Sequence, residues 1–255
     1  MTQQQDQPIP IGEARIFPFY TERPEEHDSI LIFPGGGYSH VSLIKEGENI
    51  ARAFNSEGFN AFVTEYSVAP FLKEVILSDA ENAVRRVRQL IRELRPGSGK
   101  LALMGFSAGG HLALMTAEHS PDPSISGKAS DPDNGSADAL ILCYPLVTFR
   151  DPYAHKGSRT CFLGSDQEDL IGMYSAEEHV SRDLPPVFIW HCEADRSVPI
   201  ENSMMLRDAL ARQGIACHAV FYPGGAHGLG LAQDDEIIRG WFTECVKWLR
   251  GIGFV

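Results

Sequence analysis

Residues 105–109 read Gly-Phe-Ser-Ala-Gly and place Ser107 between two glycines. The apolar run 101–104 precedes them and a helix-forming run, 111–118, follows, so the pattern predicts a strand, a tight turn and a helix. A serine at such a turn has its hydroxyl exposed on a strained elbow, where it can act as a nucleophile. The same pattern also occurs in ordinary glycine-rich loops, but the apolar strand before it favours the elbow.

A nucleophilic serine needs a base that takes its proton and an acid that orients the base. His227 lies in a glycine-rich loop after the expected strand 217–222, and Asp195 follows the expected strand 187–191. Elbow serines use partners in this chain order, acid before histidine, on loops after later strands. We therefore predict Ser107, Asp195 and His227 as catalytic residues. Taken alone, Asp195 could be a helix cap and His227 an ordinary loop histidine, but their joint placement favours catalysis.

These assignments have competitors. Glu193 could replace Asp195, but the Ser-Val-Pro that follows the aspartate begins a helix cleanly and favours Asp195. His111 competes with His227, yet its place four residues after Ser107 on the same expected helix favours packing or hydrogen bonding behind the elbow. Solvent exposure is the expected environment of His119, His155 and His179.

A third group of residues could stabilise negative charge. Residues 34–37 read Pro-Gly-Gly-Gly and follow the expected strand 29–33. Attack on an acyl carbon creates an oxyanion, which needs backbone N–H donors already aimed at it. We predict that Gly36, Gly37 and Ala108 supply these donors. Successive glycines also make flexible turns, but their entropic cost favours a site that needs close backbone approach.

Together these motifs resemble the α/β-hydrolase superfamily, in its esterase and lipase branch related to hormone-sensitive lipase and to bacterial carbohydrate acetyl esterases of the acetyl-xylan and feruloyl esterase type. The resemblance covers most of the chain. Pro34 stands where the hormone-sensitive-lipase pattern has histidine, and the glycine loop followed by Glu46 and Gly47 is closer to the carbohydrate esterases. The resemblance implies a serine carboxylesterase without metal or cofactor that acts on short acyl groups. Acetyl esters of sugars or xylo-oligosaccharides are the favoured substrates.

Two other functions stay open. A serine peptidase of the prolyl-oligopeptidase type shares Gly-x-Ser-x-Gly-Gly and the same order of catalytic residues, but the sequence has neither propeller repeats nor an evident acidic subsite for a peptide amino terminus. A non-catalytic ligand-binding protein on a hydrolase scaffold is the second alternative. Intact serine, acid and histidine disfavour it.

Elements that could position these residues alternate along the chain. Short aliphatic runs and longer helical patterns are typical of βαβ units, so we predict a single domain, 1–255, with a twisted, mostly parallel sheet covered by helices on both faces. The resemblance implies that this domain has the α/β-hydrolase fold with a small cap insertion. The expected strands are residues 14–19, 29–33, 60–66, 101–105, 139–143, 187–191 and 217–222. The expected helices are residues 44–56, 78–95, 108–119, 201–213 and 234–249.

Two segments interrupt this alternation. Residues 121–138 are rich in Ser, Asp, Pro and Gly and are expected to form an exposed excursion. Residues 144–186 form a long connection with a short helical piece near 174–179, which predicts a small cap insertion over a pocket. Tyr38 and His40 are expected to contact the substrate beside this cap.

Composition restricts the class of protein. With 43% hydrophobic and 22% charged residues, the 255-residue chain is typical of a globular protein rather than a disordered one. A net charge of −12 disfavours nucleic acid and anionic membranes as partners, which leaves a small-molecule ester. The first residues lack the features of a secretory signal, so a cytoplasmic location is expected. Five cysteines at irregular spacing are expected to be reduced and mostly buried.

Overall fold

The computed structural model describes residues 7–97, 99–118 and 137–255. Within these ranges, eight strands form one sheet in the order β1-β2-β4-β3-β5-β6-β7-β8. The strands are β1 (Ile9–Ile11), β2 (Ala14–Phe19), β3 (Ser29–Phe33), β4 (Asn60–Glu65), β5 (Leu101–Phe106), β6 (Ala139–Cys143), β7 (Val187–Cys192) and β8 (Cys217–Tyr222). β1 and β2 pair antiparallel at one edge, and the pairs from β4 to β8 are parallel.

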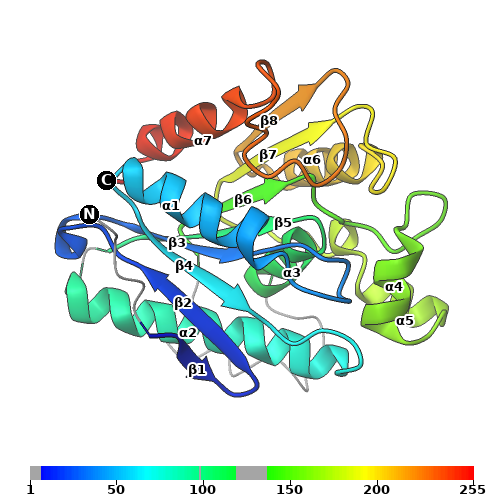
Figure 1. The fold of residues 1–255 in the computed structure, drawn as a ribbon. Coiled ribbons are helices and arrows are strands. Elements are labelled where there is room, and N and C mark those ends of the chain that lie inside the picture. The colour runs from blue at the N-terminus through cyan, green and yellow to red at the C-terminus, as the bar shows by residue number, and fades with distance from the viewer. Residues whose placement is uncertain (1–6, 98, 119–136) are drawn as a thin grey trace.

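Helices cover both faces of the sheet (Figure 1). The helices are α1 (Asn49–Ser56), α2 (Lys73–Leu94), α3 (Ala108–Ala117), α4 (Lys156–Leu163), α5 (Glu168–Met173), α6 (Glu201–Gln213) and α7 (Gly240–Gly251). Shorter turns are the 3₁₀ helices η1 (Pro24–Glu26) and η3 (Ala176–Glu178) and the π-helix η2 (Leu43–Glu48). α1 and α7 lie on one face and α2, α3 and α6 on the other, which confirms the predicted α/β-hydrolase architecture.

The sheet divides the core into two apolar clusters. Along β3, Leu31 packs with α2 and α3, whereas its neighbours Ile30 and Ile32 pack with α1 and α7. All five residues of β3 are buried, as expected for a central strand with helices on both faces. This double cover fixes the carboxyl ends of the parallel strands, where functional loops of such folds gather.

Several predicted boundaries shift. The expected helix 44–56 begins as the π-helix η2 and continues as α1. α2 begins at Lys73 rather than residue 78, because Ile76 and Leu77 already bury apolar side chains against the core. α7 begins at Gly240 rather than residue 234, since the Asp235 carboxylate accepts two nearby backbone N–H groups and holds a turn there.

Other differences lie at the edges of the fold. β1 carries a proline in a three-residue strand, too short to show a period in the sequence. The segment 144–186 contains α4, α5 and η3, a more helical insertion than expected, and Figure 1 shows α4 and α5 at the carboxyl end of the sheet. Of the expected excursion 121–138, all but the last two residues lie outside the described part of the chain.

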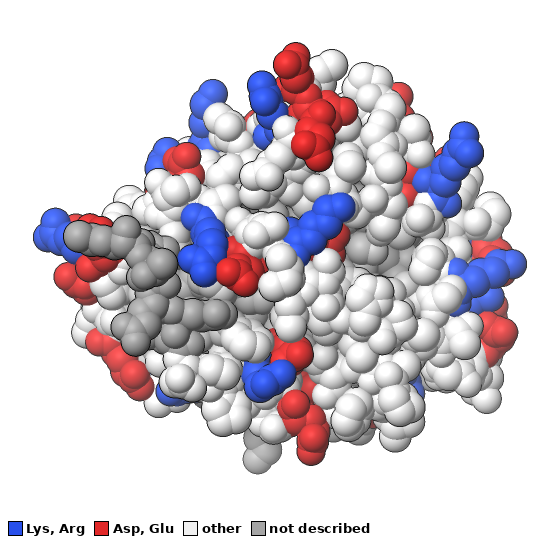
Figure 2. Space-filling model, in the orientation of Figure 1, with Lys and Arg blue, Asp and Glu red and all other residues white. Residues whose placement is uncertain are grey.

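Among the described residues, the surface charges are mixed in sign and the cysteines form no disulfide. Basic and acidic side chains are interspersed on the face shown in Figure 2 rather than gathered by sign. In the part of the chain that the structure describes, no helix combines the length and apolarity needed to cross a bilayer. All five cysteines are free; three are buried and two are partly buried.

Candidate active site

Ser107 occupies the tight turn between β5 and α3. Its φ of 52° and ψ of −119° are sparsely populated for a residue with a side chain, so the surrounding structure must hold this conformation. The turn is close-packed, because a Cβ at Gly105 would lie 2.1 Å from the Gly109 carbonyl oxygen. The Ser107 carbonyl oxygen accepts a hydrogen bond from the Leu146 N–H, and the Ser107 N–H donates to the Cys143 carbonyl oxygen. The sequence therefore forms the predicted elbow.

The structure brings Ser107, His227 and Asp195 together in one hydrogen-bonded chain. His227 Nε2 lies 2.8 Å from Ser107 Oγ, and His227 Nδ1 lies 2.6 Å from Asp195 Oδ2. Because the carboxylate only accepts, Nδ1 carries the proton and Nε2 is left to accept from the serine hydroxyl. This is the arrangement in which an imidazole can act as a general base toward a serine.

Asp195 is held from several sides. Its Oδ1 accepts the N–H groups of Ser197 and Val198 at 2.9 and 3.0 Å, and its Oδ2 also lies 3.3 Å from His191 Nε2. Burial alone would raise the pKa of Asp195, but the hydrogen bonds from His191, His227 and the backbone lower that pKa well below its usual range. The competing Glu193 is exposed on the same loop.

The glycine loop lies against the elbow. A Cβ on Gly35 would lie 3.0 Å from the Ser107 Cβ, and one on Gly36, where φ is 140°, would lie 2.0 Å from the His40 carbonyl oxygen. The N–H groups of Gly36 and Gly37 have no acceptor among the described residues. Ala108 opens α3, so its N–H also lacks a partner within the helix. These are the donors predicted for an oxyanion.

A cavity of about 400 Å³ opens above these groups. Gly36, Gly37, Ser107 and His227 line it. The other lining residues include side chains with hydrogen-bonding groups, among them Ser39, His40, Ser42, Lys45 and His155. These side chains offer hydrogen bonds to a ligand, while apolar atoms make up the larger part of the exposed cavity surface.

The two residues expected to contact substrate have different positions. His40 is exposed and lines the cavity. Tyr38 is fully buried instead: its ring packs on Phe162 at 4.6 Å, and its hydroxyl lies 2.7 Å from His111 Nδ1. The left-handed turn at Tyr38, with φ of 60°, places the ring in the core, where His111 is the polar partner that its hydroxyl requires.

His155 is a cavity residue that sequence reasoning places only in solvent. Its Nδ1 accepts the Ser158 N–H at 3.2 Å and so caps α4, which leaves the proton on Nε2. Burial, and secondly the nearby His227, lower the pKa of His155. The available signal was the position of His155 just before a helix, since capping residues there fix a side chain against the turn.

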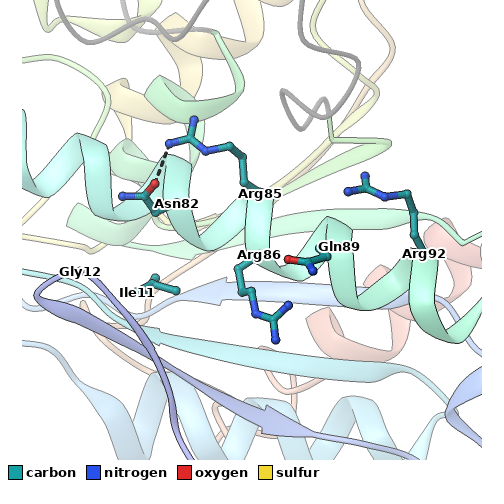
Figure 3. Close-up of a pocket in the computed structure, with 7 residues that line it drawn as sticks. All are labelled: Ile11, Gly12, Asn82, Arg85, Arg86, Gln89 and Arg92. Carbon is teal, nitrogen blue, oxygen red and sulfur yellow. Dashed lines mark hydrogen bonds between the residues drawn. The ribbon is translucent and has the colours of Figure 1, made fainter.

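In the described part of the chain, no other cavity gathers a comparable set of side chains that could carry out a reaction. A larger groove of about 610 Å³ runs along α2 and is lined by Arg85, Arg86 and Arg92. Figure 3 shows the side chains of Arg85 and Arg92 extending to one side of the helix and that of Arg86 to the other, so these guanidinium groups do not converge on one ligand. Within the described residues, no group of three His, Cys, Asp or Glu side chains could hold a metal ion.

Comparison with known proteins identifies the family of the chain. Residues 19–210 match the BD-FAE family. The chain belongs to the BD-FAE family. This confirms the predicted relationship to α/β-hydrolase esterases, and the BD-FAE match spans the glycine loop, the elbow and Asp195.

Relatives of this BD-FAE chain include a xylanase and an acetylxylan esterase. It is 34% identical to endo-1,4-beta-xylanase B of Butyrivibrio fibrisolvens over 89% of this chain and 36% of the relative. It is 30% identical to an acetylxylan esterase of Xylanibacter ruminicola over 94% of this chain and 49% of the relative. The chain thus spans half or less of the length of these relatives.

A solved structure is similar over almost its whole length. The acetyl ester-xyloside bifunctional hydrolase of Caldicellulosiruptor lactoaceticus superposes with a TM-score of 0.88 at 34% identity, covering 98% of this chain and 97% of that one. The BD-FAE chain therefore shares the fold of that chain over nearly its whole length.

Proposed function

We propose that the protein is a serine carboxylesterase that hydrolyses short acyl esters, above all acetyl esters of sugars or xylo-oligosaccharides, through an acyl-enzyme. The observation that carries the proposal is the hydrogen-bonded chain from Ser107 Oγ through His227 to Asp195. It lies at the wall of a cavity, beside backbone N–H donors that have no acceptor among the described residues. The sugar ester is supported by the hydrogen-bonding side chains that line the cavity and by the acetylxylan esterase among the relatives.

In the first half of the reaction, Ser107 Oγ attacks the carbonyl carbon of the ester while His227 Nε2 takes the hydroxyl proton. The carbonyl oxygen becomes an oxyanion, and the N–H groups of Gly36, Gly37 and Ala108 stabilise it. Asp195 stabilises the imidazolium that forms. When the tetrahedral intermediate collapses, the C–O bond to the sugar breaks and His227 returns its proton to the leaving alcohol.

In the second half, water replaces the sugar. His227 Nε2 accepts a proton from the water, whose oxygen attacks the acyl carbon of the Ser107 ester. The same backbone donors hold the second oxyanion. Collapse breaks the bond to Ser107 Oγ, which takes back the proton from His227, and a carboxylic acid leaves. The insertion 144–186 contributes His155, Gly157 and Cys161 to the wall of the cavity.

The proposal is tested by measuring hydrolysis of p-nitrophenyl acetate, acetylated xylo-oligosaccharides, alkyl esters and feruloyl esters side by side, with an aminoacyl-p-nitroanilide as the amide probe. We expect the highest kcat/KM for the acetylated oligosaccharides, labelling of Ser107 by a fluorophosphonate, and a loss of about 10⁴-fold or more in kcat for Ser107→Ala. Faster cleavage of the anilide would favour a peptidase. If the protein neither hydrolyses any of these substrates nor is labelled at Ser107, the result would favour a ligand-binding protein.

A further inference from the structure

A buried carboxylate that the reaction above does not use lies beside the catalytic residues. Glu46 is only 5% exposed, and it lies in the π-helix η2, which begins six residues after Gly37. Its side chain lines the same cavity as Ser107 and His227. A buried carboxylate is costly unless it is fully hydrogen-bonded, and π-helical turns are frequent at functional sites, so its partners are informative.

One oxygen of Glu46 holds the glycine loop. Glu46 Oε2 accepts the Gly35 N–H at 2.9 Å, and a Cβ on Gly35 would lie 2.7 Å from that oxygen, so only glycine admits the carboxylate here. The Tyr66 hydroxyl holds the preceding carbonyl of Pro34 at 2.6 Å. The start of the loop is thus fixed on both sides, and its next two N–H groups remain available for an oxyanion.

The other oxygen of Glu46 holds the loop of the catalytic histidine. The Tyr144 hydroxyl donates to Glu46 Oε1 at 2.6 Å and accepts the Gly230 N–H at 3.0 Å. Burial, and secondly the Glu46 charge, raise the pKa of Tyr144, so its hydroxyl keeps the proton that it donates. Gly230 follows His227 by three residues, and the Tyr144 ring packs edge-on against the His227 ring at 5.0 Å.

We propose that Glu46 is a positioning residue that couples the oxyanion loop to the histidine loop. The proposal rests on the proposed function, because it assigns a role in that reaction. A carboxylate accepts at both oxygens, and both of its partners, the Gly35 N–H and the Tyr144 hydroxyl, are donors. One rigid acceptor between two loops sets the distance from the oxyanion donors to the base, and errors of an ångström there reduce rates strongly.

The test is Glu46→Gln, which keeps the shape of the side chain but presents an NH₂ group to one of the two donors. We expect kcat on p-nitrophenyl acetate to fall about 10- to 100-fold with KM changed by less than about threefold. The affinity for a trifluoromethyl ketone, which adds reversibly to the serine and mimics the tetrahedral intermediate, should fall by a similar factor.

Asp28→Asn is the matched control. Asp28 is also a buried carboxylate that accepts backbone N–H groups, from Lys100 and Val255, and it pairs in addition with Arg95; it precedes β3 at the opposite end of the sheet. The Asp28→Asn substitution should lower the melting temperature and leave kcat and the affinity for the ketone unchanged. Tyr144→Phe keeps the ring on His227 and removes the hydroxyl, and should reproduce the loss in kcat.

The outcomes separate the two proposals. Esterase activity and Ser107 labelling in the wild-type protein, with Glu46→Gln behaving like Asp28→Asn, would overturn the role of Glu46 and leave the proposed function standing. Absence of any esterase activity in the wild-type protein would instead remove the proposed function. Should Glu46→Gln fail to fold, Tyr144→Phe decides: full kcat would overturn the coupling, and a selective loss of kcat would support it.

Discussion

At the scale of single residues, Asp195 controls which nitrogen of His227 carries a proton. Its Oδ1 accepts two backbone N–H groups, so only Oδ2 faces the imidazole. In Asp195→Asn the side-chain carbonyl must keep the place of Oδ1, which puts the NH₂ group against His227 Nδ1. Nδ1 then accepts, Nε2 carries the proton, and the base can no longer take one from Ser107. We expect kcat on p-nitrophenyl acetate to fall by about 10⁴-fold.

The neighbouring acid gives the control. Glu193→Gln changes an exposed carboxylate two residues away and should leave kcat within about twofold. A large loss in Glu193→Gln with an active Asp195→Asn enzyme would reverse the assignment of the acid. Both proteins are compared by steady-state kinetics and by the rate of Ser107 labelling.

Sequence predicts a residue well when its neighbours along the chain define its position. Ser107, Asp195 and His227 each follow a strand that is legible as an apolar run, and parallel strands end at a common edge. Glu46 has no such signature, because its partner Tyr144 lies 98 residues further along the chain, and His155 is marked only by its position just before α4. Tyr38 shows the reverse case: proximity to the glycine loop suggests substrate, but a positive φ turns its ring into the core.

At the scale of elements, α4 is held at its start by His155. The Nδ1 atom accepts the Ser158 N–H, one of the donors that a helix cannot satisfy internally. His155→Ala removes this cap and should lower the free energy of unfolding by about 1 kcal/mol, whereas His155→Asn should cost only a few tenths, because asparagine is among the best capping residues.

Urea unfolding of the two His155 variants measures this difference. The asparagine variant is the matched control, since both substitutions remove the imidazole ring and its packing and only one retains a cap. Equal destabilisation of the two variants would show that ring packing, rather than capping, stabilises the start of α4.

Element boundaries were less predictable than element order, for physical reasons. Periodicity predicts one helix over 44–56, but the chain forms η2 and then α1, so that Glu46 and Gly47 are buried. The period of apolar residues does not distinguish a π turn from an α turn over six residues. The Asp235 turn that delays α7 is likewise a local side-chain to backbone competition.

At the scale of the whole molecule, stability is linked to pH through a histidine behind the elbow. His111 is fully buried, with Nε2 donating to the Tyr174 carbonyl at 2.8 Å and Nδ1 accepting from the Tyr38 hydroxyl. This pairing requires the neutral ring, and burial lowers the pKa of His111 to about 4, although its hydrogen bond to Tyr174 acts in the opposite direction. An unfolded histidine titrates near about 6.5.

The sign of the effect follows from these two values. Between pH 6.5 and about 4 the unfolded chain binds a proton at His111 that the folded protein does not, so stability falls as the pH falls through this window. The contribution of His111 is complete above about pH 6.5 and decreases by about 3 kcal/mol by pH 4. Below that pH both states are protonated and the loss stops.

His111→Gln isolates this effect, because the glutamine amide offers an NH₂ donor and a carbonyl acceptor without a titrating ring. We expect the free energy of unfolding of the wild-type protein to decrease more steeply than that of the variant between pH 7 and 4, the difference between the two curves changing by about 3 kcal/mol. Other buried groups, such as Asp79 with its raised pKa, titrate in both proteins and cancel in the comparison. Parallel curves across this range would contradict the prediction, because they would mean that His111 has the same pKa in the folded and the unfolded protein.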